Sequence, residues 1–490
     1  MDIGRRSFTL SMAGGMSFSA WGLAPRPNLF VLVLIELLRP DFLEAAWGKL
    51  SNGGFRKLIA SGAYFPDCRH LASTFPSTTL ATLATGAWPA EHGIVADSWW
   101  DRRPGRLVKG SAGELLATTV AGEIAAVGGT RVYVVAARAE QAALVGAHPA
   151  AQLFWQDAEG RFNTLGNAPA WLAPFNKERP IEALHGAGWL AAGAPAGAPA
   201  LRVLEFDAAH PQGFAELYQA SPFAAAALFD FLRELSSNEK LGQSGSFDFV
   251  CLVVNAPARL GFETGASSPL MQQMTLQIDL QMESLLAQLR RTVGDKGFHL
   301  AVAGCHGAPP APPPAARARM AVAGESVAQA IESALRERNL GHVEKYLYPF
   351  LYLDGGAMRD LEPMRQAAMA AALEHPAVAG CYTASGVCSS RDEWERRFRH
   401  SFHRTRSGDL MLSYRPEYVE DYGQGRGISY GSLYNYDTTV PLCLYGPRFR
   451  AGVFEAPIEA VDLAPTLARA CGVAPPSYST GRVLGEALAE

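Results

Sequence analysis

The feature that most constrains the fold is a series of short apolar segments separated by longer stretches with helical periodicity. The first segment, NLFVLVLIELL at residues 28–38, is almost continuously apolar, which is typical of a parallel strand covered on both faces. Four more segments of this kind follow, namely TRVYVVAA, FDFVCLVVN, FHLAVAGC and TVPLCLYG. Helical patterns, such as residues 269–294, lie between them. This alternation predicts an α/β fold with a doubly wound, mostly parallel sheet flanked by helices.

Two regions interrupt the alternation of strands and helices. Residues 111–220 are rich in Ala, Gly and Pro, and we interpret them as an inserted cap. Residues 320–425 contain helical patterns and the strand candidate YPFLYLD, and we interpret them as a second insertion. The chain has 490 residues, so residues 26–490 are expected to form one large domain that carries both insertions.

The first 25 residues have the pattern of a targeting segment. Arg5-Arg6-Ser7-Phe8 is followed by a mildly apolar stretch and small residues, which is similar to a twin-arginine export signal. The alternative is a weakly basic, disordered leader. An export signal predicts a periplasmic or otherwise exported protein. The seven cysteines have irregular spacing and predict no disulfide framework, although Cys381 and Cys388 are candidates for a pair.

Charge and hydropathy exclude two classes of partner. Lys and Arg number 43 against 47 Asp and Glu, a net charge of −4, whereas nucleic-acid binding rewards clustered basic residues. No segment reaches the roughly 18 apolar residues that a membrane-spanning helix needs. We therefore expect no nucleic-acid partner and no membrane span, which leaves an unknown small molecule or protein as the partner.

Polar residues follow three of the predicted strands and define a candidate site. In doubly wound sheets, ligands bind beyond the carboxyl ends of the strands. This rule places Glu36, residues 255–262 and the pair Cys305-His306 around one crevice. A Cys-His pair at the end of a buried strand is consistent with a metal site, a reactive thiol or a structural remnant.

Several segments, taken in order, carry a family resemblance. FPSTTLATLATGAWPAEHGIVADSWWD at 75–101 is followed by AGCHGAPP at 303–310, RSGDLML at 406–412 and ISYGSLYNYDTTVPLCLYGP at 428–447. The series resembles the alkaline phosphatase superfamily, in particular the branch of phosphate-irrepressible alkaline phosphatases and type I phosphodiesterase/nucleotide pyrophosphatases. The resemblance covers nearly the whole chain after residue 25. It implies a phosphomonoesterase or phosphodiesterase that uses two zinc ions about 4 Å apart and a threonine nucleophile.

Three zinc-ligand positions that the resemblance implies hold side chains unsuited to zinc. Ala258 occupies the position of an Asp, Phe262 that of a His, and Tyr430 that of a distant His. Methyl and phenyl groups cannot donate a lone pair to a metal, so the resemblance implies that the first zinc site is lost.

The positions of the second zinc hold Glu36, Cys305 and His306. All three residue types bind zinc, so a rewired single-zinc site is one interpretation. The other is a metal-free site in which Cys305 packs as a small hydrophobic residue and His306 is a hydrogen-bonded remnant. We therefore expect no cofactor, with one zinc ion as the alternative.

The nucleophile segment is altered as well. The family's spacing puts Pro76 at the nucleophile position, and Thr78 and Thr79 are the nearby candidates, unless these hydroxyls cap a helix. Asp97 replaces the Asn that holds a phosphate oxygen in the family, and its negative charge would repel a phosphate dianion. The Lys-x-Arg pair that contacts phosphate is reduced to Arg138.

Three functional hypotheses follow from these replacements. The first is a catalytically inactive family member, a pseudo-phosphatase with a binding or scaffold role. The second is an active phosphoric monoester or diester hydrolase with one metal at Glu36, Cys305 and His306. The third is a metal-independent Ser/Thr hydrolase, for which His306 is the single candidate base.

Overall fold

The computed structural model describes residues 28–195, 197–207, 211–310, 321–322, 324–383, 393–416, 418–421 and 429–489. The predicted export signal and Cys388 lie outside these residues. None of the described cysteines, which include Cys381, forms a disulfide with another described cysteine.

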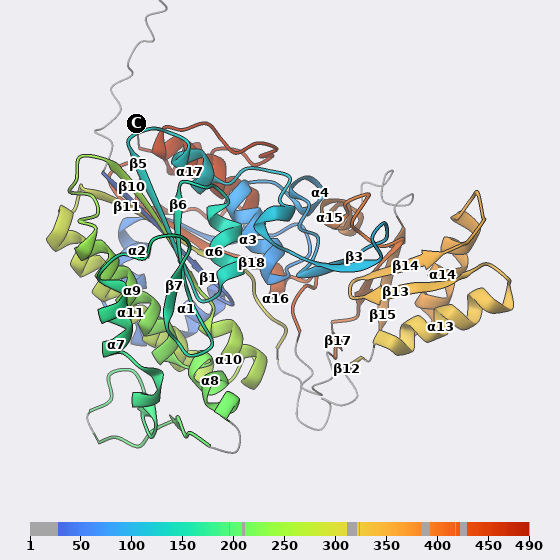
Figure 1. The fold of residues 1–490 in the computed structure, drawn as a ribbon, viewed down its shortest axis with the longest axis horizontal. Coiled ribbons are helices and arrows are strands. Elements are labelled where there is room, and N and C mark those ends of the chain that lie inside the picture. The colour runs from blue at the N-terminus through green and yellow to red at the C-terminus, as the bar shows by residue number, and fades with distance from the viewer. Residues whose placement is uncertain are drawn as a thin grey trace, which may run out of the picture.

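A ten-stranded sheet forms the centre of the molecule (Figure 1). Strand β1 (Leu29–Ile35) lies in the middle, with β10 on one side and β11 on the other, and both pair with it in parallel. Beyond β11, strand β18 pairs antiparallel with β11, and β2 pairs antiparallel with β18. At the opposite edge of the sheet, β7 pairs antiparallel with β6. The confirmed fold class is thus α/β with a mostly parallel sheet. The other strands are β2 (Ala63–Arg69), β5 (Thr130–Ala136), β6 (Ala151–Gln156), β7 (Phe162–Thr164), β10 (Phe247–Val254), β11 (Phe298–Gly304), β18 (Thr439–Tyr445), β19 (Gly452–Val453) and β20 (Ile458–Glu459).

Helices cover both faces of the sheet, which explains why β1 is apolar throughout. Val31, Val33 and Ile35 belong to one core, and the alternate residues of β1 belong to the other. The first core is covered by α1 (Pro40–Ala46), α2 (Phe55–Ser61), α9 (Pro222–Asn238) and α11 (Pro269–Val293). The second is covered by α3 (Pro76–Thr85), α5 (Val120–Ala125), α6 (Ala139–Gly146) and α17 (Leu463–Cys471). Among the described helices, none combines the length and hydropathy that crossing a bilayer requires.

Part of the segment predicted as an inserted cap, residues 111–220, belongs to the main sheet. Strands β5, β6 and β7 lie within it and continue the sheet beyond β10. The part that lies off the sheet begins after β7 and contains α7 (Leu172–Glu178), a two-stranded hairpin of β8 (Gly188–Trp189) and β9 (Arg202–Val203), and α8 (Pro211–Gln219). The Ala- and Gly-rich composition therefore extends over more residues than the segment that leaves the sheet.

The described residues between 321 and 421 include a second sheet with its own core, and its elements lie to one side of the main sheet (Figure 1). The sheet has the order β13 (His342–Leu347), β14 (Phe350–Asp354), β16 (Leu410–Tyr414), β15 (Val378–Thr383), and it packs with α13 (Gly324–Glu337) and α14 (Glu362–Glu374). The hairpin of β3 (Ser98–Asp101) and β4 (Arg106–Lys109) contacts it. There Trp100 donates from Nε1 to Glu344 at 2.7 Å.

Helix α3 begins without the side-chain cap that the sequence suggested. It starts at Pro76, its N-cap residue is Phe75, and no side chain of that residue accepts a bond from the helix. Ser77 lies inside the first turn, where its backbone N–H donates to Asp97 Oδ1 at 2.9 Å. An N–H group at the start of the helix is therefore bonded by the Asp97 carboxylate, 20 residues later in the chain, and not by a side chain of the helix itself.

The buried ring of His92, at the end of α4 (Pro89–His92), predicts that the protein loses stability in acid. Its Nδ1 accepts from the Ile94 N–H at 3.0 Å and its Nε2 contacts Thr82 Oγ1 at 3.1 Å, so the ring is bonded as the neutral form. Burial, together with the nearby Arg406 and His403, lowers the pKa of His92 to about 3. Protonation therefore favours the unfolded chain once the pH falls below the ordinary histidine value near 6.5.

We expect this one residue to remove about 2 kcal/mol of unfolding free energy as the pH falls from 7 to 5. His92→Asn keeps an acceptor near Ile94 and cannot titrate, so its stability should fall less steeply over that range. Urea unfolding midpoints measured at several pH values test this. Parallel losses in the wild-type protein and the variant would show that the ring is not held neutral.

Candidate functional site

The predicted crevice lies at the carboxyl ends of the central parallel strands. Glu36 directly follows β1 and its N–H donates to the Val254 carbonyl of β10 at 2.9 Å. Cys305 directly follows β11 and its N–H donates to the Ile35 carbonyl of β1 at 2.9 Å. The parallel register of the three strands thus holds both residues at the same edge of the sheet.

The three lost zinc positions come together, and side chains fill the space between them. Ala258 and Phe262 lie four residues apart on α10 (Ala256–Thr264). The Tyr430 hydroxyl donates to the Ala258 carbonyl at 2.5 Å. The Tyr430 ring centroid lies 6.0 Å from that of Phe262 and 4.8 Å from that of His306. An aromatic contact therefore occupies the place where the resemblance implied metal ligands.

Glu36 is held by a partner that the sequence reading missed. It is 3% exposed, and Gln141 Nε2 donates to its Oε1 at 2.5 Å. Gln141 is the third residue of α6, the helix that follows β5. The same strand-end rule that selected Glu36 could have selected Gln141, because it too follows a central strand.

Cys305 presents a thiol rather than a thiolate. Burial raises the pKa of this thiol well above its ordinary value, and the nearby Glu36 and Cys251 raise it further. Zinc binds the thiolate form. In this surrounding the sulfur is a buried, protonated group.

His306 is fully buried and uses one of its two ring nitrogens. Nδ1 donates to the Gly307 carbonyl at 2.8 Å, whereas Nε2 has no partner among the described residues. His70 Nε2 is also without such a partner, and burial together with His306 lowers the pKa of His70 to about 3. With Nδ1 as the donor, the Nε2 atom of His306 is a buried acceptor without a described hydrogen-bond partner.

The residues present do not fit a pair of zinc ions. Within the described ranges, no three His, Cys, Asp or Glu side chains are arranged so that they could hold a metal ion. The first set of positions offers a methyl group, a phenyl ring and a phenol already bonded to Ala258. The second set offers a carboxylate bonded to Gln141, a protonated thiol and one imidazole nitrogen. The predicted single-zinc site stays a prediction.

The nucleophile candidates are buried in the first turn of α3. Thr79 Oγ1 donates to the Pro76 carbonyl at 3.2 Å, and Thr78 Oγ1 has no partner among the described residues. Asp97 lies at the same helix end, where it accepts from Ser77. A helix N-terminus is a place where anions bind, because its N–H groups are unpaired and its dipole is positive. Here a carboxylate of the chain itself takes that place.

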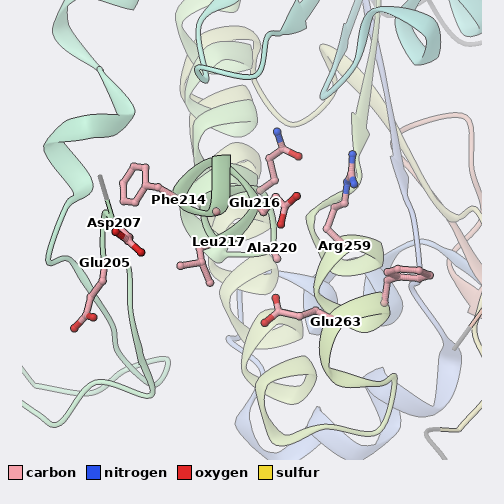
Figure 2. Close-up of a pocket in the computed structure, with 11 residues that line it drawn as sticks. Glu205, Asp207, Phe214, Glu216, Leu217, Ala220, Arg259 and Glu263 are labelled. Carbon is pink, nitrogen blue, oxygen red and sulfur yellow. The ribbon is translucent and has the colours of Figure 1, made fainter. Parts of the chain in front are cut away.

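Three cavities open along this edge of the sheet. One of about 280 Å³ lies beside Asp97 and Gln141, and one of about 160 Å³ lies between Arg138 and Asn255. The largest, about 430 Å³, lies between α8 and α10 (Figure 2). The two larger cavities lie on the side of Arg138 and Arg259, and a further small hollow of about 10 Å³ is lined by Tyr430 and Asp437.

Comparisons with known proteins find relatives that are named as alkaline phosphatases. The chain is similar to the alkaline phosphatase PhoV of Synechococcus elongatus, with 23% identity over 94% of this chain and 93% of the relative. It is also similar to the alkaline phosphatase PafA of Elizabethkingia meningoseptica, with 20% identity over 98% of both chains.

Solved structures agree on the fold. The crystal structure of wild-type alkaline phosphatase PafA matches with a TM-score of 0.81 at 18% identity, over 95% of this chain and 100% of that one. Murine ectonucleotide pyrophosphatase/phosphodiesterase 5, solved in an inactive form with AMP, matches with a TM-score of 0.60 at 13% identity, over 94% of this chain and 99% of that one. The family model for type I phosphodiesterase/nucleotide pyrophosphatase matches residues 30–429. The chain therefore belongs to the type I phosphodiesterase/nucleotide pyrophosphatase family, within the alkaline phosphatase superfamily.

Proposed function

We propose that this protein is a catalytically inactive member of its family, which binds a small molecule or a protein instead of hydrolysing a phosphate ester. Members of the family are typically zinc-dependent. The observation that carries the proposal is the Tyr430 side chain, whose hydroxyl bonds to Ala258 and whose ring packs against His306. The space that two metal ions and a phosphate would need is closed by this side chain.

The charge at the start of α3 supports the same proposal. Asp97 bonds the Ser77 N–H and brings a negative charge to the end of the helix that carries the nucleophile candidates. A phosphate dianion at that point would meet an anion and find a backbone donor already engaged. Both features would weaken the binding of a phosphate ester at the start of α3.

Metal content and activity, measured on the same preparation, test the proposal. The protein is purified without chelators from zinc-supplemented medium, and its zinc is quantified by mass spectrometry. Hydrolysis of an aryl phosphate is then followed with and without added zinc, with a metal-loaded alkaline phosphatase as the positive control. We expect far less than one zinc ion per chain and no hydrolysis above buffer. Two tightly bound zinc ions per chain would overturn the proposal.

A single-zinc hydrolase is the second candidate, favoured by one observation. The unpaired Nε2 of His306 is the kind of donor that a zinc ion uses. This candidate requires that Cys305 ionises and that Glu36 turns from Gln141 to the metal. If the preparation hydrolyses the aryl phosphate and Cys305→Ala retains the full rate, the single-zinc arrangement is excluded.

The proposed place of action is an exported compartment, on the strength of Arg5 and Arg6 in the leader. Fractionation of the producing cells, with the Arg5→Lys/Arg6→Lys variant alongside the wild-type chain, tests this. Wild-type protein found in the cytoplasm alone would contradict export.

A further inference from the structure

The three cavities at the carboxyl edge of the sheet share lining residues and so form one trough. Arg138 lines both the 280 Å³ and the 160 Å³ cavities. Gln219 and Arg259 line both the 160 Å³ and the 430 Å³ cavities. The middle cavity is therefore the junction between the two larger ones, and an arginine stands at each of its ends.

Both arginines of the middle cavity have unused donors. In the described part of the chain, the guanidinium groups of Arg138 and Arg259, both of them exposed side chains, have no hydrogen-bond or ion-pair partner. A guanidinium offers five N–H donors in a planar fork that matches the oxygens of a carboxylate or a phosphate. Two such groups facing one small cavity favour an anionic occupant.

A buried amide gives the cavity a third polar group. Asn255, at the carboxyl end of β10, is 7% exposed and lines the cavity, and its side chain has no described hydrogen-bond partner. Buried amides are normally bonded, so this one points to a ligand or to water in the cavity. The cavity also contains Asp157, but its carboxylate already accepts from the N–H groups of Glu159 and Arg161, at 3.1 and 2.8 Å. That carboxylate is thus engaged by its own loop.

We propose that Arg138, Asn255 and Arg259 bind the oxyanion end of a small molecule. This inference rests on the proposed binding function, since it assigns a ligand class to the same crevice. Arg138 stands at the position of a phosphate-contacting arginine that the resemblance implied, whereas Asn255 and Arg259 lie in the segment that lost the zinc ligands and are the new members of the site. The oxyanion is a carboxylate or a phosphate, and the experiment below separates these two sources.

The neighbouring 430 Å³ cavity indicates what the rest of the ligand looks like. Its volume is typical of small-molecule sites. Figure 2 shows the acidic side chains Glu205, Asp207, Glu216 and Glu263 around it, with Arg259 extending away from Glu263. A second anionic group would be repelled there, whereas an uncharged or cationic body would not. The ligand therefore carries one oxyanion and no second negative charge.

Titration of the full-length protein with a matched series of probes tests the site. The probes are 6-aminohexanoate, hexanoate, adipate and inorganic phosphate, with binding followed by ligand-observed NMR in zinc-free buffer. We expect saturable binding of the monoanions, with 6-aminohexanoate tighter than hexanoate and adipate weakest. Arg138→Gln and Arg259→Gln should each weaken binding about tenfold or more, because each removes a charge-assisted pair of hydrogen bonds.

Arg103→Gln is the matched control, since Arg103 is an exposed arginine outside the three cavities. It should leave binding unchanged, and Arg259→Lys should recover part of the loss by restoring the charge without the fork. Binding of phosphate but of no carboxylate would assign the site to phosphate. Absence of saturable binding for all four probes, or equal affinity in the Arg259→Gln variant, would overturn the inference. Neither result depends on zinc content or hydrolysis, so this inference and the proposed function fail separately.

Discussion

The variant Ala258→Asp/Phe262→His/Tyr430→His is expected to bind about one zinc ion per chain, where the wild-type protein binds none stoichiometrically. The structure brings the three positions together, because Tyr430 bonds Ala258 and its ring lies 6.0 Å from Phe262. Positions 258 and 262 lie four residues apart on α10 and so face the same side of the helix. One carboxylate and two imidazoles are a sufficient set of protein ligands for zinc.

Cobalt substitution provides the readout for this variant, since tetrahedral Co²⁺ gives a visible absorption band that tracks the ligand set. Circular dichroism confirms that the variant is folded, because the new carboxylate at position 258 is buried without its metal. The control is Phe262→His/Tyr430→His, which lacks the carboxylate and should bind zinc at least about tenfold more weakly. A folded triple variant with no more zinc than the wild-type protein would show that the three positions are not the former metal site.

Asp248→Ala is expected to lower the unfolding free energy by about 3–5 kcal/mol, the largest stability effect that we predict. Asp248 is fully buried at the start of β10, where it accepts from Arg131 Nε and from a second Arg131 nitrogen, both at 2.7 Å. It also accepts from the Gly242 N–H at 2.7 Å. Removal of the Asp248 carboxylate leaves the Arg131 guanidinium without its counter-charge and the Gly242 N–H without an acceptor.

A surface ion pair provides the control for Asp248. An Asp295 carboxylate oxygen lies 2.9 Å from Arg290 Nε, and the Asp295 side chain is 74% exposed, so Asp295→Ala should cost less than about 1 kcal/mol. Asp248→Asn separates the charge from the shape, and its loss should lie between the two. The measurement is the shift in urea midpoint at constant m-value. Equal shifts for Asp248→Ala and Asp295→Ala would contradict the account.

Features encoded in local sequence were predictable, and features set by long-range packing were not. The apolar run at residues 28–38 predicted the buried central strand, because a parallel strand is covered on both faces. The strand-end rule placed Glu36 and Cys305 at one edge, as the register of β1, β10 and β11 shows. The resemblance assigned Tyr430 and Ala258 to one former zinc site, and in the structure the Tyr430 hydroxyl donates to the Ala258 carbonyl.

The rest depended on contacts between segments far apart in the chain. Gln141 donates to Glu36 although 105 positions separate them in the sequence, and no pattern in either segment predicts the pair. The start of α3 was expected to be capped by its own hydroxyls, but Asp97 reaches it from the following hairpin. Arg259 lies within the segment 255–262 that the strand-end rule placed at the crevice, but the cavity that it shares with Arg138 is set by the fold.

The chain has the family's fold although the implied zinc-ligand positions hold other residues, and its packing gives a physical reason. Ala258 belongs to one of the two cores that cover the sheet, Cys305 belongs to the other, and Tyr430 packs against the first. At these positions the side chains that stand in place of metal donors therefore add to the core packing. Tyr430 adds a hydrogen bond and ring contacts where a metal would otherwise stabilise the site.

The most direct test of the account is an anomalous diffraction measurement at the zinc edge, on crystals grown with zinc in excess. We expect no anomalous peak in the space enclosed by Glu36, Cys305, His306 and Tyr430, and the Tyr430 hydroxyl still bonded to the Ala258 carbonyl. A pair of peaks about 4 Å apart in that space, with Tyr430 displaced, would contradict the account.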